Sequence, residues 1–184
     1  ARSKFQQVGG AANSYEKAVV HAAVCLIKEK RTDEGVRELE SYLNDYVTDS
    51  THDVSQNEVK RARRAEAMGM ATFYLGNQAA RDKDHDRVIE LLSDYAKQYP
   101  DQTAYGANAL YYVLLAHLEK MDFAGAKATH AEMVDTFPTS TATGSGALKI
   151  YKVYADEQEA AEERGDDAAA AVALEGRATY LHIS

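Results

Sequence analysis

Hydrophobic residues recur at helical spacing most clearly between residues 105 and 141. Two apolar stripes are separated by a very short polar turn: Leu110, Val113, Leu114, His117, Leu118 and Met121, then Phe123, Ala126, His130, Met133, Val134 and Phe137. Each set places one apolar face on a helix. The short turn predicts two antiparallel helices, with Asp122 as N-cap of the second and Ala124–Ala126 allowing close approach. Pro138 ends this second helix.

The same pattern predicts helices along the rest of the chain. We expect one beginning at Asn13 or Ser14, a second after residue 33, a long third from about Val54 to Ala80, and a fourth running unbroken to Tyr99. After the central pair, one helix follows from about residue 143 and another from about Asp167. The segments 1–12 and 48–56 are predicted to be irregular. No alternating Val/Ile/Thr run occurs, so the fold class is all-α.

The predicted turns divide the chain into similar units. They lie near Arg31, Lys83, Met121 and Gly165, and the pairs Tyr99-Pro100 and Phe137-Pro138 are 38 residues apart. One helix pair cannot bury both of its apolar stripes, so copies are expected to stack. We therefore predict one domain over residues 1–184, with units at about 13–48, 54–100, 102–138 and 141–184.

This repeat resembles the tetratricopeptide repeat family over residues 68–141. Met121-Asp122-Phe123 stands where the family has its Gly-Asp-Tyr turn, Ala126 falls on the small residue of helix B, and Pro138 on the terminal proline. In the preceding unit, Leu75-Gly76 and Pro100 match the family's Leu-Gly pair and proline. The chain departs from the family in having no tryptophan, in Leu114 at a helix-A glycine, and in His117 and His130 at usually aromatic positions.

The resemblance implies a right-handed α-solenoid of about four helix pairs that binds protein partners. The aromatic-Pro stops and the 38-residue spacing are more similar to bacterial cell-envelope members of the family than to eukaryotic co-chaperones. The compartment stays open between the periplasm or cell envelope and the cytoplasm.

The family also suggests where a partner would bind. Members that hold a peptide's carboxyl terminus use Lys, Asn and Arg on successive A helices, whereas the corresponding positions here carry no cation. The predicted binding groove on the concave helix-A face is lined by Phe73, Asn77, Asn108, Tyr111 and Tyr151. Aromatic rings and amides suit an extended or helical peptide. About half of the twelve tyrosines are expected to fill helix interfaces only.

Composition narrows the function classes. The net charge of −8 argues against wholesale nucleic-acid binding, and most of it falls after Asp122. A basic run, Lys60, Arg61, Arg63 and Arg64, would either grip an acidic partner, an anionic lipid or nucleic acid, or form a solvated face that balances nearby acids. No stretch is long and apolar enough to insert in a membrane. The single Cys25 excludes an internal disulfide.

Catalytic chemistry is not indicated. No Ser-His-Asp order, phosphate loop or Cys-His metal spacing occurs. His117 and His130 are the best metal candidates, predicted to face each other across the central helix pair, but zinc sites need three or four ligands at defined spacing. We predict no cofactor, no metal and no enzyme activity.

Three hypotheses remain. The first is a non-catalytic scaffold that binds a protein or peptide in its concave face. The second is a structural or oligomerisation module of a longer chain, suggested by the Ala-rich last helix, with self-association through residues 168–184. The third is a metal-binding or enzymatic domain that uses the two histidines.

Overall fold

The computed structural model describes residues 15–48 and 58–181, and within these ranges every regular element is a helix. The helices are α2 (Tyr15–Lys28), α3 (Thr32–Thr48), α4 (Glu58–Arg81), α5 (His85–Leu92), α6 (Tyr95–Gln98), α7 (Thr103–Glu119), α8 (Phe123–Thr136), α9 (Thr141–Glu163) and α10 (Asp167–Leu181). The all-α prediction is therefore confirmed. The predicted cap at residue 13 or 14 and the irregular segments 1–12 and 49–56 lie outside the described residues.

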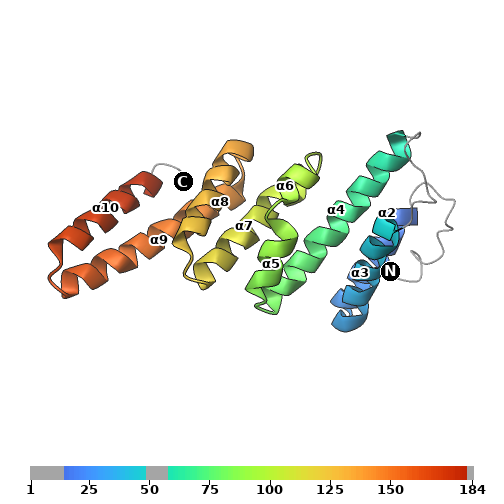
Figure 1. Cartoon of the computed structure of the whole chain (residues 1–184), viewed down its shortest axis with the longest axis horizontal. Helices are drawn as coiled ribbons and strands as arrows, with labels where there is room; N and C mark the ends of the chain where they lie inside the picture. Colours follow the sequence, from blue (N-terminus) through green and yellow to red (C-terminus); the bar gives the residue numbers. More distant parts are fainter. Residues whose placement is uncertain (1–14, 49–57, 182–184) are drawn as a thin grey trace.

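The helices form a row of pairs in chain order (Figure 1). Within the row, α2 packs on α3, α4 on α5, α7 on α8, and α9 on α10. Neighbouring pairs meet through their first helices, α2 with α4, α4 with α7 and α7 with α9. Each pair thus contacts its neighbours in the sequence, which is the logic of a repeat protein. A tetratricopeptide-type superhelix remains a prediction.

Three apolar cores lie between successive pairs. The first joins α2, α3 and α4 around Val20 and Leu39, the second joins α4, α5 and α7 around Leu92 and Val113, and the third joins α7, α8 and α9 around Leu114. Because each core lies between two pairs, no pair buries its apolar residues by itself.

The four turns inside the pairs share one backbone conformation. Lys30, Lys83, Met121 and Gly165 all have a positive φ between 59° and 69°. In each turn the next residue's N–H bonds to the carbonyl five residues earlier, as from Asp122 to His117. This left-handed residue satisfies the last carbonyls of the first helix and reverses the chain. A recurrent turn in all four pairs supports the repeat that the spacing predicts.

One predicted helix is wrong. The fourth helix was expected to run unbroken to Tyr99, but it divides into α5 and the single turn of α6, with Ser93 and Asp94 between them. The Ser93 N–H still bonds to the Ile89 carbonyl, and the Asp94 carbonyl then accepts from Lys97 and Gln98. Leu92 and Tyr95, on either side of the break, are both fully buried.

Candidate functional site

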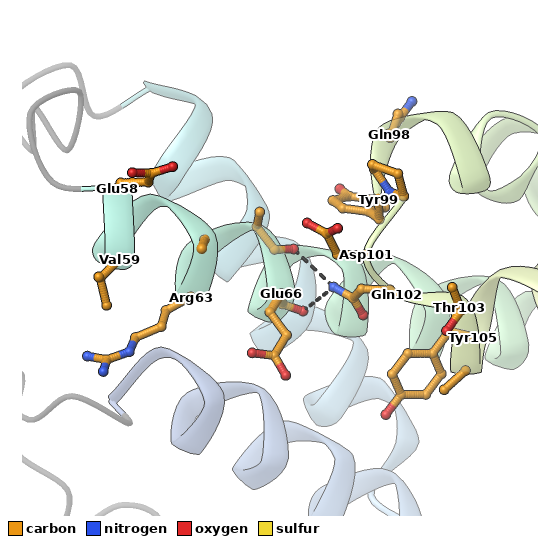
Figure 2. A pocket seen from close by; sticks show the side chains of 14 residues that line it. Glu58, Val59, Arg63, Glu66, Gln98, Tyr99, Asp101, Gln102, Thr103 and Tyr105 are labelled. Carbon is orange, nitrogen blue, oxygen red and sulfur yellow. Dashed lines mark hydrogen bonds between the residues drawn. The ribbon is translucent and has the colours of Figure 1, made fainter.

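A hollow lies between the first turns of α4 and the segment that joins α6 to α7 (Figure 2). We call it the amino-end groove; its volume is about 660 Å³. It is lined by Glu58, Val59, Ala62, Arg63, Ala65, Glu66, Gln98, Tyr99, Pro100, Asp101, Gln102, Thr103, Ala104 and Tyr105. A volume of this size is in the range that receives side chains or small molecules.

One wall of the groove is held to α4 by Gln102. Its Nε2 donates to the backbone carbonyls of Ala65, at 3.2 Å, and Glu66, at 2.7 Å (Figure 2). Beside it, the buried Tyr95 hydroxyl donates to the Gly69 carbonyl at 3.1 Å. Burial raises the pKa of Tyr95, so the hydroxyl stays protonated and keeps donating. These bonds fix the segment that forms one wall of the groove.

Gln102 is the N-cap residue of α7, but its side chain makes no capping hydrogen bond there. The Gln102 side chain bonds to α4 instead. Its place is available because Gly69 has no side chain: a Cβ there would lie 2.3 Å from Gln102 Nε2.

The charged groups at the rim of the groove are mainly acidic, and the rest of its lining is largely apolar. Glu58, Glu66 and Asp101 line it together with one cation, Arg63. Glu66 also pairs with Lys17 of α2 at 2.6 Å. Val59 is 58 % exposed beside these groups. The arrangement suits an apolar side chain flanked by basic residues.

Aromatic rings continue from this groove along the α4–α7 interface. Tyr105, which lines the groove, lies 4.7 Å from Phe73 between ring centroids, and Phe73 lies 6.1 Å from Tyr112. Tyr112 in turn accepts a hydrogen bond of 2.6 Å from Asn77 Nδ2. Burial raises the pKa of Tyr105. The rings therefore form a connected wall between α4 and α7.

The five predicted groove residues do not all lie together. Phe73 and Asn77 lie on the α4–α7 interface, but Phe73 is buried. Asn108 is exposed and donates to its own helix at the Ala104 carbonyl. Tyr111 packs against the core between α7 and α9, and the Tyr151 hydroxyl accepts from Arg177 of α10.

Sequence reasoning missed Tyr105 and Tyr112, the α7 residues that do meet Phe73. They are seven residues apart and so share a helix face. Of the two α7 residues that were predicted, Asn108 is three residues after Tyr105 and lies beside that face, whereas Tyr111, one residue before Tyr112, is turned away from it. The i, i+7 tyrosine pair was the signal available in the sequence.

A second hollow lies at the other end of the same interface, among α4, α5 and α7. We call it the polar pocket; its volume is about 370 Å³. It is lined by Asn77, Ala80, Arg81, Lys83, His85, Val88, Tyr112, Leu115, Ala116 and Glu119. Of the predicted groove residues, only Asn77 lines it.

The two candidate metal ligands have separate partners. His117 Nδ1 bonds to Asp122 Oδ2 at 2.8 Å, whereas His130 Nε2 donates to the Thr143 carbonyl at 3.2 Å. His130 is buried and its ring lies against Tyr180. Among the residues that the structure describes, no three His, Cys, Asp or Glu side chains gather as a metal site would require.

The basic run at the start of α4 does not act as one patch. Arg64 Nε bonds to Glu16 of α2 at 3.3 Å, and Arg63 lines the amino-end groove. Arg61 is exposed, and the side chain of Lys60 lies outside the described residues. At Arg64, the interpretation that these cations balance nearby acids agrees with the structure.

Comparison with family models, with curated proteins and with solved structures finds no match for this chain. The resemblance to tetratricopeptide repeats therefore stays a prediction. In the ranges 15–48 and 58–181, no helix has the length and apolar character needed to cross a membrane.

Proposed function

We propose that this chain is a non-catalytic protein-interaction scaffold whose amino-end groove binds a peptide segment of a partner. The groove itself carries the proposal, because an apolar hollow of about 660 Å³ lies open beside the exposed Val59. Well-packed apolar anchors in such hollows supply most of the affinity at protein interfaces.

Charge defines the kind of peptide. Glu58, Glu66 and Asp101 outnumber Arg63 at the rim. The expected ligand is a segment with one large apolar side chain and Lys or Arg beside it. The apolar residue enters the groove, and its basic neighbours lie over the acidic rim, where charge complementarity favours them over acidic competitors.

Selection of random twelve-residue peptides displayed on phage, with the whole chain immobilised, tests the proposal. We expect enrichment of peptides with an apolar residue flanked by Lys or Arg. The double variant Val59→Ser with Asp101→Asn should weaken their binding about tenfold, since it removes an apolar contact and a rim charge.

Two substitutions of the same kind elsewhere provide the control. Val172→Ser with Asp135→Asn changes a 68 % exposed valine of α10 and an exposed aspartate of α8. This control should bind the selected peptides as the unchanged chain does. Enriched peptides that bind both double variants equally would contradict the proposed groove.

Self-association is a second candidate function, favoured by one observation. Val172 and Leu174 of α10 are 68 % and 54 % exposed, and Leu148 of α9 is 51 % exposed. Exposed apolar side chains on the last pair offer contacts for a second copy. Sedimentation velocity of the chain and of Val172→Ser with Leu174→Ser tests this: a dimer that persists in the variant excludes α10 as its interface.

A further inference from the structure

The polar pocket has a counterpart in the next pair. A smaller hollow of about 210 Å³, the apolar pocket, lies among α7, α8 and α9. Its lining residues include Leu118, Phe123, Ala126, Ile150, Val153, Tyr154 and Glu157. Each is 38 residues after a residue of the polar pocket, respectively Ala80, His85, Val88, Tyr112, Leu115, Ala116 and Glu119. The two hollows therefore occupy the same place in successive repeats.

The polar pocket is larger than the apolar pocket, about 370 Å³ against about 210 Å³, and differs from it at specific positions. Where the apolar pocket has Leu118 and Tyr154, the polar pocket has the smaller Ala80 and Ala116.

The replacements also change its chemistry. His85 stands in the place of Phe123, and Tyr112 in the place of Ile150. Asn77 Nδ2 donates to the Tyr112 hydroxyl, so the hydroxyl's own proton is left to donate to another group. Arg81 Nε donates to Asn77 Oδ1 at 3.2 Å, which orients the amide and leaves the outer guanidinium nitrogens as further donors.

The charge around the pocket is positive. Two cations, Arg81 and Lys83, line it against one acid, Glu119. In the described part of the chain, neither Arg81 nor Lys83 has a salt-bridge partner.

The aspartates of the adjoining turn are engaged elsewhere. Asp84 accepts from the Arg87 N–H as an N-cap, Asp86 pairs with Lys120, and Asp82 accepts from Gln78. None of the three lines the pocket. Their charges still moderate the local potential, which favours a singly charged ligand over a doubly charged one.

We propose that the polar pocket binds a small organic carboxylate with a short apolar body. The carboxylate accepts hydrogen bonds from Tyr112 and Arg81, with Lys83 adding positive charge. The apolar body lies against Val88 and the neighbouring Leu115 and Ala116. The single charge matches the excess of cations over Glu119, and carboxylate oxygens match a site built from donors. This site is independent of the proposed peptide groove.

Calorimetric titration of the whole chain with 4-phenylbutyrate tests the proposal, with 4-phenylbutyramide and phenyl phosphate as matched probes. We expect the carboxylate to bind at least tenfold more tightly than either. Equal binding of the amide would overturn the anion site, and tighter binding of phenyl phosphate would overturn the carboxylate assignment. Tighter binding of a pentapeptide with a free carboxyl terminus would overturn the small-molecule assignment.

Substitutions locate the site. Tyr112→Phe and Arg81→Gln should each weaken 4-phenylbutyrate binding at least fivefold. Tyr111→Phe, the adjacent tyrosine of α7, and Arg31→Gln, an arginine at the turn of the first pair, should leave it unchanged. Loss of binding in the control variants, or none in the first two, would place the ligand elsewhere.

A variant in which larger side chains fill the polar pocket tests the proposal without weakening the fold. Ala80→Leu with His85→Phe introduces into the polar pocket the residues that line the apolar pocket at the equivalent positions, Leu118 and Phe123. Because these residues occur at the equivalent positions 38 residues on, the variant should fold and keep its thermal stability while losing 4-phenylbutyrate binding. Retained binding in this variant would overturn the proposal.

Discussion

At the scale of single residues, aspartates direct the chain through its turns. Asp84, Asp122 and Asp166 each follow a residue with positive φ, and each accepts a hydrogen bond from the backbone N–H three residues on. Such an N-cap satisfies a free donor at the helix start. The hydrogen bond from the Gly125 N–H, and to a smaller extent the one from His117, holds the pKa of the Asp122 carboxyl below its usual range. Three of the four turns thus use the same residue for the same purpose.

His130 makes stability depend on pH. Burial lowers the pKa of His130 below its ordinary value of 6.5, although its bond to the Thr143 carbonyl acts in the opposite direction. The unfolded chain therefore binds more protons than the folded chain below about pH 6.5. Stability is full above this pH and falls as the pH decreases. His21, whose pKa burial also lowers, acts in the same sense.

Replacement of His130 by Gln isolates this contribution. The amide can still donate to Thr143 but does not titrate in this range. We expect the free energy of unfolding, measured with urea at a series of pH values, to fall less steeply with acid in His130→Gln than in the unchanged chain. An identical pH dependence in both proteins would show that His130 is not protonated differently on folding.

The sequence predicted some residue roles and missed others for one physical reason. The N-cap at Asp122 and the close approach at Gly125 depend on neighbours within a few positions. A Cβ on Gly125 would indeed lie 2.4 Å from His117 Nδ1. Gln102 and Tyr112 instead find their partners more than thirty residues away. Such pairings depend on how helices pack, and periodicity does not contain that information.

At the scale of elements, the last helix shows the same limit. The helical spacing of Ala170, Leu174, Ala178 and Leu181 predicts an inward stripe on α10, but Leu174 and Ala178 are exposed. Ala173 is buried instead, and Arg177 donates to Gln158 of α9 at 2.6 Å. An alanine-rich helix has no marked apolar face, so small residues and one polar network, rather than a hydrophobic stripe, decide which side meets α9.

Two glycines inside helices should respond in opposite ways to replacement by alanine, one variant losing stability and the other gaining it. Gly69→Ala places a Cβ 2.3 Å from Gln102 Nε2 and 3.0 Å from the Tyr99 ring. Gly144→Ala, inside α9, meets no atom within 4 Å. Alanine favours the helix by about 1 kcal/mol over glycine, so Gly144→Ala should stabilise the chain by up to that amount. Gly69→Ala should destabilise it by about 1–2 kcal/mol, since Gln102 loses its bonds to α4.

Urea unfolding of both glycine variants measures this difference. Because both positions are inside helices, the propensity gain is common to the two, and the difference reports the contact alone. The phage-selected peptides should also bind Gly69→Ala more weakly, because residues 98–105 form one wall of the groove. Stabilisation by Gly69→Ala would show that residues 99–102 do not approach α4 as closely as the structure indicates.

At the scale of the whole molecule, the 38-residue spacing of the aromatic-Pro pairs also relates equivalent positions of successive helix pairs. The sequence predicted the fold class and the order of the helices, because each stripe is a local pattern. The equivalence of the polar and apolar pockets extends that spacing into three dimensions. Their different chemistry was beyond prediction, since each hollow is assembled from three helices.

The row of pairs predicts that stability is local. Leu114 is fully buried between α7, α8 and α9, whereas Val20 is fully buried at the other end, between α2, α3 and α4. Leu114→Ala should cost about 2–5 kcal/mol, because it leaves a cavity. In a repeat protein this loss acts mainly on the pairs that share the core. Hydrogen exchange followed by mass spectrometry should therefore speed up in α7–α10 and change little in α2 and α3.

Val20→Ala provides the reciprocal control for that experiment. Its smaller cavity should speed exchange in α2–α4 and leave α9 and α10 nearly unchanged. The argument depends on direct contacts, because α2 and α3 pack on α4 and the last pair meets the rest of the described chain through α7 and α8. If either substitution accelerated exchange equally along the whole chain, the molecule would unfold as one cooperative unit, and its pairs would not have the local stability expected of stacked repeats.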